Sequence, residues 1–352
     1  MPAPLTLSLK ADKQVELPRF GGHLSASGRR PGEVRFGCRD STAALPVGAG
    51  SGSAACAASP PVGRWRGAAI MSEAGEPSTV GWVALCTGVT VPYVEQGAGS
   101  GVPVLLLHAY VDSWRFFEPV LHHLPPSIHA YAFTQRGHGD AERPRDGYRP
   151  EDFAADVAAF MDAVGLESAV IVGQSSGGYV AQRFAIDRPG RTLGLVLIST
   201  PRDFRDKPAD LSRTVSQLTD PVDPKFVRKF VQSTITQPVA PAYLETLVAE
   251  SCKVPARVWK ATLEGLLDAD VPIECGTISA PTLLLWGDRD TLCPRSEQDA
   301  LAAAIVSAEL VTYPGTGHLV ACEQPARAAA DIVAFAQRLR GIEPGATLEP
   351  GV

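Results

Sequence analysis

The chain has 352 residues, of which 45% are hydrophobic and 20% are charged, and this composition is typical of a soluble globular protein with a sizeable core. The formal net charge is −6 at pH 7, and beyond residue 82 there is no long run of Lys or Arg, so we expect no nucleic-acid partner. No apolar stretch reaches the roughly 20 residues of a bilayer-spanning helix, so we expect no membrane insertion either.

Residues 1–82 differ in composition from the rest of the chain. They are rich in Gly, Ala, Ser, Pro and Arg, and they lack helical or strand periodicity. Such a segment buries too little apolar surface to offset chain entropy, which predicts disorder. It is a flexible tail, an Arg- and Ser-rich targeting segment, or upstream sequence included by an early start codon before Met71. We favour the last interpretation, and we expect function to be independent of this segment.

Regular alternation of strands and helices begins after Trp82. Continuous apolar runs such as "GVPVLLLHAY", "SAVIVGQ" and "APTLLLWGDRD" alternate with helical patterns over residues 83–200 and 278–340. Continuous apolar strands are typical of a parallel sheet that is buried on both faces. The sequence therefore predicts an α/β fold, with a mostly parallel twisted sheet of about eight strands covered by helices on both faces, and a C-terminal tail at 341–352.

Residues 201–277 interrupt this alternation after the sixth predicted strand. Their pattern predicts three or four helices that carry aromatic side chains such as Phe204, Phe226 and Trp259. These side chains either pack into a small bundle or form the underside of a cap over an apolar pocket, and both can hold together. The sequence does not identify which residues line the pocket.

The stretch "VIVGQSSGGYVAQRFA" places Ser175 between an apolar strand and a helix. A strand that turns at once into a helix at a serine strains the serine backbone and crowds the residues two before and two after it. This crowding explains Gly173 and Gly177, and we expect Gly178 to let the helix approach neighbouring backbone. The turn exposes the serine hydroxyl beside a helix N-terminus, which favours negative charge.

A serine needs a base and an acid to become a nucleophile. Asp288 and Asp290 follow an apolar strand at the same predicted sheet edge as Ser175, and His318 is the one histidine that follows both the serine and the acids. The residues alone leave the choice between the two aspartates open.

The motifs "GQSSG", "GDRDTLCP" and "GTGH", in this order, resemble the α/β-hydrolase superfamily of capped serine hydrolases over residues of about 83 to 340. The resemblance implies that Ser175 is the nucleophile, Asp290 the acid and His318 the general base and acid. It further implies an oxyanion hole made by the backbone N–H groups of Ser176 and Tyr110.

Other residues of these motifs receive structural roles. The family's usual His-Gly pair after the strand reads His108-Ala109 here, which makes the oxyanion loop less open. Asp288 is expected to hold its loop. Arg136, in a turn that resembles the family's Arg-Gly-x-Gly, and the two histidines His108 and His138 are expected to brace the site rather than to react.

The predicted function is hydrolysis of a carboxylic ester, thioester or lactone of a small apolar molecule. Carbon–carbon bond hydrolases, enol-lactone hydrolases and cofactor-free perhydrolases share the serine and stay open, as does a slow-turnover ligand receptor built on this fold. The sequence has no nucleotide-binding or metal-binding motif, so no cofactor or metal is expected. The seven cysteines have no C-x-x-C pair and predict reduced thiols in a cytoplasmic protein. The oligomeric state is not predicted.

Overall fold

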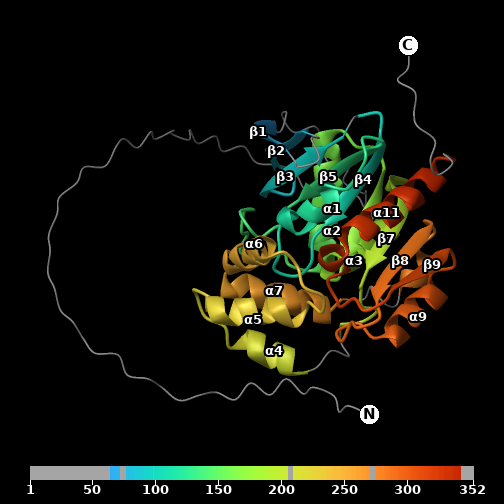
Figure 1. The fold of residues 1–352 in the computed structure, drawn as a ribbon. Helices are drawn as coiled ribbons and strands as arrows, with labels where there is room; N and C mark the ends of the chain where they lie inside the picture. The colour runs from blue at the N-terminus through green and yellow to red at the C-terminus, as the bar shows by residue number, and fades with distance from the viewer. Residues whose placement is uncertain (1–63, 72–76, 98, 205–208, 270–273, 342–352) are drawn as a thin grey trace, which may run out of the picture. The chain divides into compact units, whose positions relative to one another are not determined.

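The computed structural model describes residues 64–71, 77–97, 99–204, 209–269 and 274–341 (Figure 1). Their centre is a nine-stranded sheet in the order β1-β2-β3-β5-β4-β6-β7-β8-β9. Strands β1, β2, β3 and β5 pair antiparallel, whereas β5, β4 and β6 to β9 run parallel. The strands are β1 (Arg64–Met71), β2 (Pro77–Ala84), β3 (Thr90–Gln96), β4 (Val102–Leu107), β5 (Ile128–Phe133), β6 (Ala169–Gln174), β7 (Thr192–Ile198), β8 (Thr282–Gly287) and β9 (Ala308–Tyr313).

The predicted start of the folded part is wrong. Strand β1 and most of β2 lie within residues 1–82, which the sequence assigned to a disordered extension, and β1 is the additional, ninth strand. β1 pairs antiparallel with β2 along most of its length, from Arg64 opposite Val83 to Met71 opposite Pro77. A protein that began at Met71 would lack this strand. Residues 1–63 lie outside the described part.

Helices cover both faces of the sheet, as predicted. A side chain at Gly173 in β6 would meet the start of α3, whereas one at Gly194 in β7 would meet Phe335 of α11. Gly173 pairs with Leu197, which is three residues from Gly194, and side chains alternate along a strand, so α3 and α11 lie on opposite faces. The described helices outside the insertion are α1 (Glu118–Leu121), α2 (Pro150–Val164), α3 (Ser176–Asp187), α9 (Arg295–Ala304), α10 (Val320–Glu323) and α11 (Pro325–Leu339), with the short 3₁₀ turns η1 (Trp114–Phe117) and η2 (Pro189–Arg191). A third 3₁₀ turn, η3 (Cys275–Thr277), lies at the end of the insertion.

Burial on both faces explains why the central strands are apolar throughout. Every residue of β6 and of β8 is buried, so neither strand shows the alternation of polar and apolar residues that a half-exposed strand has. The polar exceptions are Thr282, at the amino end of β8, and Gln174, at the carboxyl end of β6 beside the candidate site.

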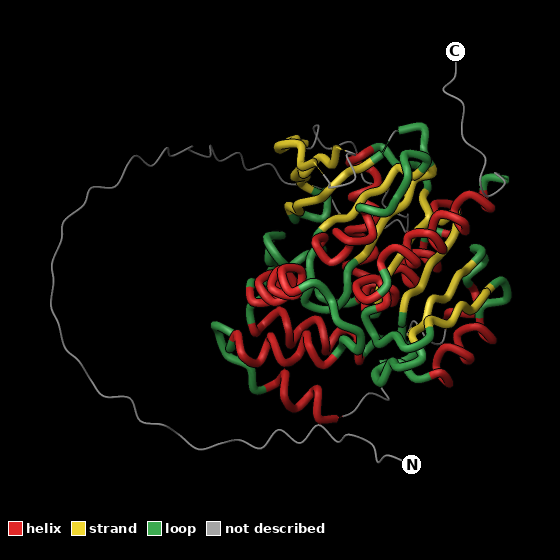
Figure 2. The backbone as a smooth tube through the Cα atoms, viewed as in Figure 1, coloured by secondary structure: helices red, strands yellow, loops and turns green. Residues whose placement is uncertain are grey.

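The helical insertion lies between β7 and β8 (Figure 2). Its described helices are α4 (Ala209–Ser216), α5 (Pro224–Ser233), α6 (Pro241–Cys252) and α7 (Ala256–Leu267). Proline occupies the first turn of α5 and α6, where its missing N–H has no intrahelical partner to lose. The Tyr243 hydroxyl of α6 donates a 2.5 Å hydrogen bond to the Phe116 carbonyl, which ties the insertion to the core.

Candidate active site

Ser175 occupies a strained turn between β6 and α3. Its backbone has φ 53° and ψ −117°, in the left-handed region that side chains disfavour. A Cβ on Gly173 would collide with the Gly177 backbone, and one on Gly177 would collide with the carbonyl oxygens of Leu107 and His108. Both glycines are therefore required by the close approach of β6, α3 and the end of β4.

The reason for Gly178 differs from the expected one. A Cβ there would collide with the side chain of Thr200, not with neighbouring backbone. Thr200 follows β7, so the absence of a side chain at Gly178 lets α3 pack closely against the end of that strand.

The structure brings Ser175, His318 and Asp290 into one hydrogen-bonded chain. Asp290 follows β8 and His318 follows β9, so all three residues lie at the carboxyl edge of the parallel strands. The Ser175 Oγ lies 2.9 Å from His318 Nε2, and His318 Nδ1 lies 2.9 Å from Asp290 Oδ2. A carboxylate only accepts hydrogen bonds, so Nδ1 carries the proton and the serine hydroxyl donates to Nε2. All three side chains are buried.

Asp290 is held as a carboxylate. Burial raises its pKa, but the His318 charge and the hydrogen bonds from His318 and from the backbone N–H groups of Cys293 and Leu292 outweigh this and lower the pKa below the ordinary value. The two backbone N–H groups donate to Oδ1, at 2.8 Å from Leu292 and 2.9 Å from Cys293. Oδ2 is thus left for His318, and Asp290 is ionised at neutral pH.

Asp288 lies in the same loop but has a different partner. Its Oδ1 accepts a hydrogen bond of 2.6 Å from the backbone N–H of Gly315. This bond connects the loop after β8 to the loop after β9, three residues before His318. The two aspartates therefore differ in their partners: Asp290 binds the His318 side chain, whereas Asp288 binds the backbone of the loop before it.

The two predicted oxyanion donors lie on neighbouring segments, the start of α3 and the loop after β4. Ser176 is the first residue of α3, and its N–H has no partner within the helix. Tyr110 follows β4, which is the sheet neighbour of β6. The contact of Gly177 with the backbone of Leu107 and His108 brings the two segments together. Val111 next to Tyr110 has φ 61°, which marks a sharp turn in this loop.

Arg136 and His108 hold the loops around the site. The Arg136 guanidinium donates two hydrogen bonds of 2.6 Å to the buried Asp156 carboxylate and a third to the Gly147 carbonyl. His108 Nδ1 donates to the Ala109 carbonyl, and its Nε2 accepts from the Gln135 N–H. Both patterns agree with the bracing roles expected from the sequence.

His138 gives the fold a measurable pH dependence. Burial lowers the pKa of His138 to about 4. The hydrogen bond from this histidine to the Arg136 carbonyl raises the pKa, but by less than burial lowers it. The unfolded chain takes up this proton near pH 6.5 and the folded chain does not, so stability falls as pH falls from about 6.5 towards 4. We expect His138 to account for about 2 kcal/mol of the loss in unfolding free energy between pH 7 and pH 5.

Urea unfolding of the wild type and of His138→Gln at both pH values measures this loss. The variant is expected to be less stable at pH 7 but to lose less stability on acidification. His108 remains in both proteins, but its pKa is lowered by burial and also by the charge of His138, so the difference between the two pH slopes includes this coupling. Identical pH slopes for the two proteins would contradict the assignment.

Gln174 is a site residue that the sequence reasoning missed. Its side chain is fully buried at the end of β6, and its Nε2 donates a 2.8 Å hydrogen bond to the backbone carbonyl of His318. The residue before Ser175 thus links the serine strand directly to the histidine loop. The available signal was a polar residue in an otherwise apolar, fully buried strand.

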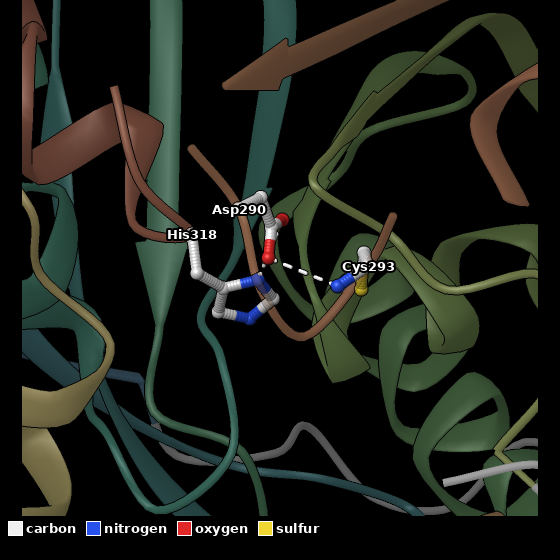
Figure 3. A group of neighbouring side chains, drawn as sticks. All are labelled: Asp290, Cys293 and His318. Atoms are coloured by element: carbon white, nitrogen blue, oxygen red, sulfur yellow. Dashed lines mark hydrogen bonds and ion pairs between the residues drawn. The ribbon is translucent and has the colours of Figure 1, made fainter. Parts of the chain in front are cut away.

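In the described part of the chain, one group of three side chains places potential metal-binding atoms close together. It consists of Asp290, Cys293 and His318, whose ligand atoms lie within 4.8 Å of one another (Figure 3). Cys293 is close because its backbone N–H binds the Asp290 carboxylate. Both ring nitrogens of His318 already have partners in Asp290 and Ser175, so an ion held by this group would have to displace one of those hydrogen bonds. The arrangement fits a hydrogen-bonded chain better than a ligand set.

In the part of the chain that the structure describes, no helix is both long and apolar enough to cross a membrane. None of the cysteines in this part forms a disulfide. Cys38 and Cys56 lie outside it.

Comparison with known proteins agrees with this fold. Residues 104–332 match the sequence model of the alpha/beta hydrolase family, which is more than half of the chain. The chain therefore belongs to the alpha/beta hydrolase family.

Individual relatives have diverse names. Haloalkane dehalogenase 2 of Mycobacterium tuberculosis is 30% identical over 270 residues, which cover 69% of this chain and 90% of that protein. Non-heme chloroperoxidase of Streptomyces lividans is 25% identical over 275 residues, 73% of this chain and 99% of that protein. The crystal structure of a bacterial membrane phospholipase A superposes with a TM-score of 0.67 and 26% identity, covering 76% of this chain and 87% of that one.

Proposed function

We propose that this protein is a serine hydrolase that cleaves a carboxylic ester, thioester or lactone of a small apolar molecule through an acyl-enzyme on Ser175. The observation that carries the proposal is the hydrogen-bonded chain from Ser175 through His318 to Asp290 at the carboxyl edge of the sheet. A serine beside a neutral imidazole that is oriented by a carboxylate is an activated nucleophile.

The reaction follows from this geometry. Ser175 Oγ attacks the carbonyl carbon while its proton passes to His318 Nε2. The oxygen of the tetrahedral intermediate accepts hydrogen bonds from the N–H groups of Ser176 and Tyr110. The bond to the leaving group then breaks, and the leaving oxygen or sulfur takes the proton from His318. Water attacks the acyl-enzyme by the same route and releases the acid. Asp290 stays ionised and stabilises the imidazolium at each step.

Aromatic side chains of the insertion pack on the loop that carries Tyr110. Trp259 of α7 is fully buried and packs edge-on against the rings of Tyr110 and Phe230, at centroid distances of 5.3 and 5.2 Å. The Tyr110 hydroxyl donates a 2.5 Å hydrogen bond to the Trp259 carbonyl. The insertion therefore packs on the loop that carries the proposed oxyanion donor, which is the place of a cap. Of the other predicted cap aromatics, Phe226 joins this cluster and Phe204 packs against Tyr179 instead.

Similarity to a dehalogenase does not lead us to propose dehalogenation. That reaction needs a carboxylate nucleophile at the turn after β6, and this chain has Ser175 there. Perhydrolysis would use the same acyl-enzyme, with hydrogen peroxide in place of water as the attacking molecule. Its product, a peracid, distinguishes it from hydrolysis.

Trapping of the acyl-enzyme tests the proposal. We expect the full-length protein to hydrolyse p-nitrophenyl butyrate, and acid quenching during turnover to leave a butyryl group on the peptide that contains Ser175, as measured by mass spectrometry. A fluorophosphonate should label the same serine and stop turnover. Turnover with the acyl group elsewhere would contradict the proposal, whereas trapping without turnover would favour a slow receptor. Peracid formation on addition of hydrogen peroxide would identify the perhydrolase alternative.

A further inference from the structure

Glu323 is a buried carboxylate outside the Ser175–His318–Asp290 chain. It ends α10, five residues after His318, and 9% of its surface is exposed. Its Oε2 accepts a 2.9 Å hydrogen bond from the backbone N–H of Gly317, the residue before His318. A Cβ on Gly317 would come within 2.7 Å of Glu323 Oε1, so glycine at this position lets the carboxylate approach the backbone.

The same oxygen binds the insertion. Oε2 of Glu323 also accepts a 2.8 Å hydrogen bond from the backbone N–H of Gln237, in the linker between α5 and α6. The Gln237 side chain continues this contact, because its Nε2 donates to the Gly315 carbonyl at 3.1 Å and to the Thr316 hydroxyl at 3.3 Å. One side chain thus joins the histidine loop, 314–319, to the α5–α6 linker, 234–240.

His318 is therefore held through its backbone from two sides. Gln174 binds its carbonyl from the serine strand, and Glu323 binds the preceding N–H together with the linker. The 2.9 Å distance from Nε2 to Ser175 depends on where this short loop lies. A displacement of about 1 Å in such a pair costs on the order of 100-fold in rate.

We propose that Glu323 is a positioning residue that keeps His318 in line with Ser175 and makes this alignment depend on the α5–α6 linker of the insertion. The inference rests on the hydrolase function proposed above. It predicts that the acceptor oxygen of Glu323 matters, and that its charge does not.

Four single variants of the full-length protein test this prediction. Glu323→Leu removes the acceptor, and Glu323→Gln keeps an oxygen that can accept both N–H groups. Gln237→Ala removes the linker's side-chain bonds to Gly315 and Thr316. Gln232→Ala is its matched control, because Gln232 lines the same surface groove as Gln237 and its side chain makes no hydrogen bond to the described histidine loop. Rates with p-nitrophenyl butyrate are divided by the number of sites that a fluorophosphonate labels.

We expect Glu323→Leu to lower kcat per active site about 10- to 100-fold, with KM within about 2-fold. Glu323→Gln should restore kcat to within about 3-fold of the wild type, and Gln237→Ala should lower it several-fold while Gln232→Ala does not. A residue that only stabilises the fold would lower the labelled fraction and the Tm without changing kcat per site. Wild-type kcat in Glu323→Leu, or equal loss in the Gln and Leu variants, would overturn the proposal.

Two further results keep this test separate from that of the proposed function. If Glu323→Leu does not fold, the comparison of Gln237→Ala with Gln232→Ala decides. If the wild type neither hydrolyses esters nor is labelled at Ser175, the hydrolase function fails, and hydrogen exchange still measures the contact. Gln237→Ala should speed amide exchange in residues 314–319, and unchanged exchange there would overturn the link between linker and loop.

Discussion

Replacement of Ser175 by alanine is expected to lower kcat for p-nitrophenyl butyrate by about 10⁵- to 10⁶-fold, and addition of His318→Ala to the same chain should lower it little further. The two side chains act as one unit, because the serine is a nucleophile only when Nε2 takes its proton at 2.9 Å. The residual activity of all three variants should come from the oxyanion donors and substrate binding, which neither substitution removes. Steady-state kinetics of the two single variants and the double variant measures this.

Two controls make the result interpretable. Circular dichroism and the urea midpoint should show that each variant is folded, and the strained backbone at Ser175 remains acceptable to alanine. A fluorophosphonate should label His318→Ala far more slowly than the wild type and should not label Ser175→Ala. Losses that multiply in the double variant would show that the two residues act independently, which the single hydrogen-bonded chain does not allow.

Local patterns were sufficient to predict the parts of the site that depend on local structure. A strand, a serine between glycines and a helix define the turn at Ser175, because only close backbone packing explains Gly173 and Gly177. The parallel sheet follows from continuous apolar runs, and it places the ends of β8 and β9 at the edge where Ser175 lies. The expected acid and base follow from that edge and from chain order.

Features that depend on distant partners were not predictable in this way. Strand β1 has no alternating pattern and is defined by pairing with β2, so its sequence resembled the preceding segment. Gln174 and Glu323 have their roles through backbone groups of a loop and a linker whose positions only the folded chain determines. The role of Gly178 likewise depended on Thr200 at the end of a neighbouring strand.

Substitution of the two loop aspartates tests the assignment of the acid. Asp290→Asn is expected to lower kcat about 10³- to 10⁴-fold, because an amide that donates to Nδ1 holds the imidazole in the tautomer that cannot take the serine proton. Asp288→Asn is the matched control. Its amide oxygen can still accept the Gly315 N–H, so kcat should stay within about 3-fold of the wild type.

The pH dependence of kcat/KM is a second test of the assignment of Asp290 as the acid. Because the pKa of Asp290 is lowered below the ordinary carboxyl value in the folded protein, its carboxylate contributes stability above that ordinary value, and this stability is lost as pH falls through the lowered pKa. A fall of wild-type kcat/KM with decreasing pH that already occurs above pH 5 is therefore caused by protonation of a group other than Asp290. Asp288→Asn should leave the midpoint of this fall unchanged. If Asp288→Asn proved to be the damaging change and Asp290→Asn the mild one, the hydrogen bond from His318 Nδ1 to Asp290 would not be the one that orients the base.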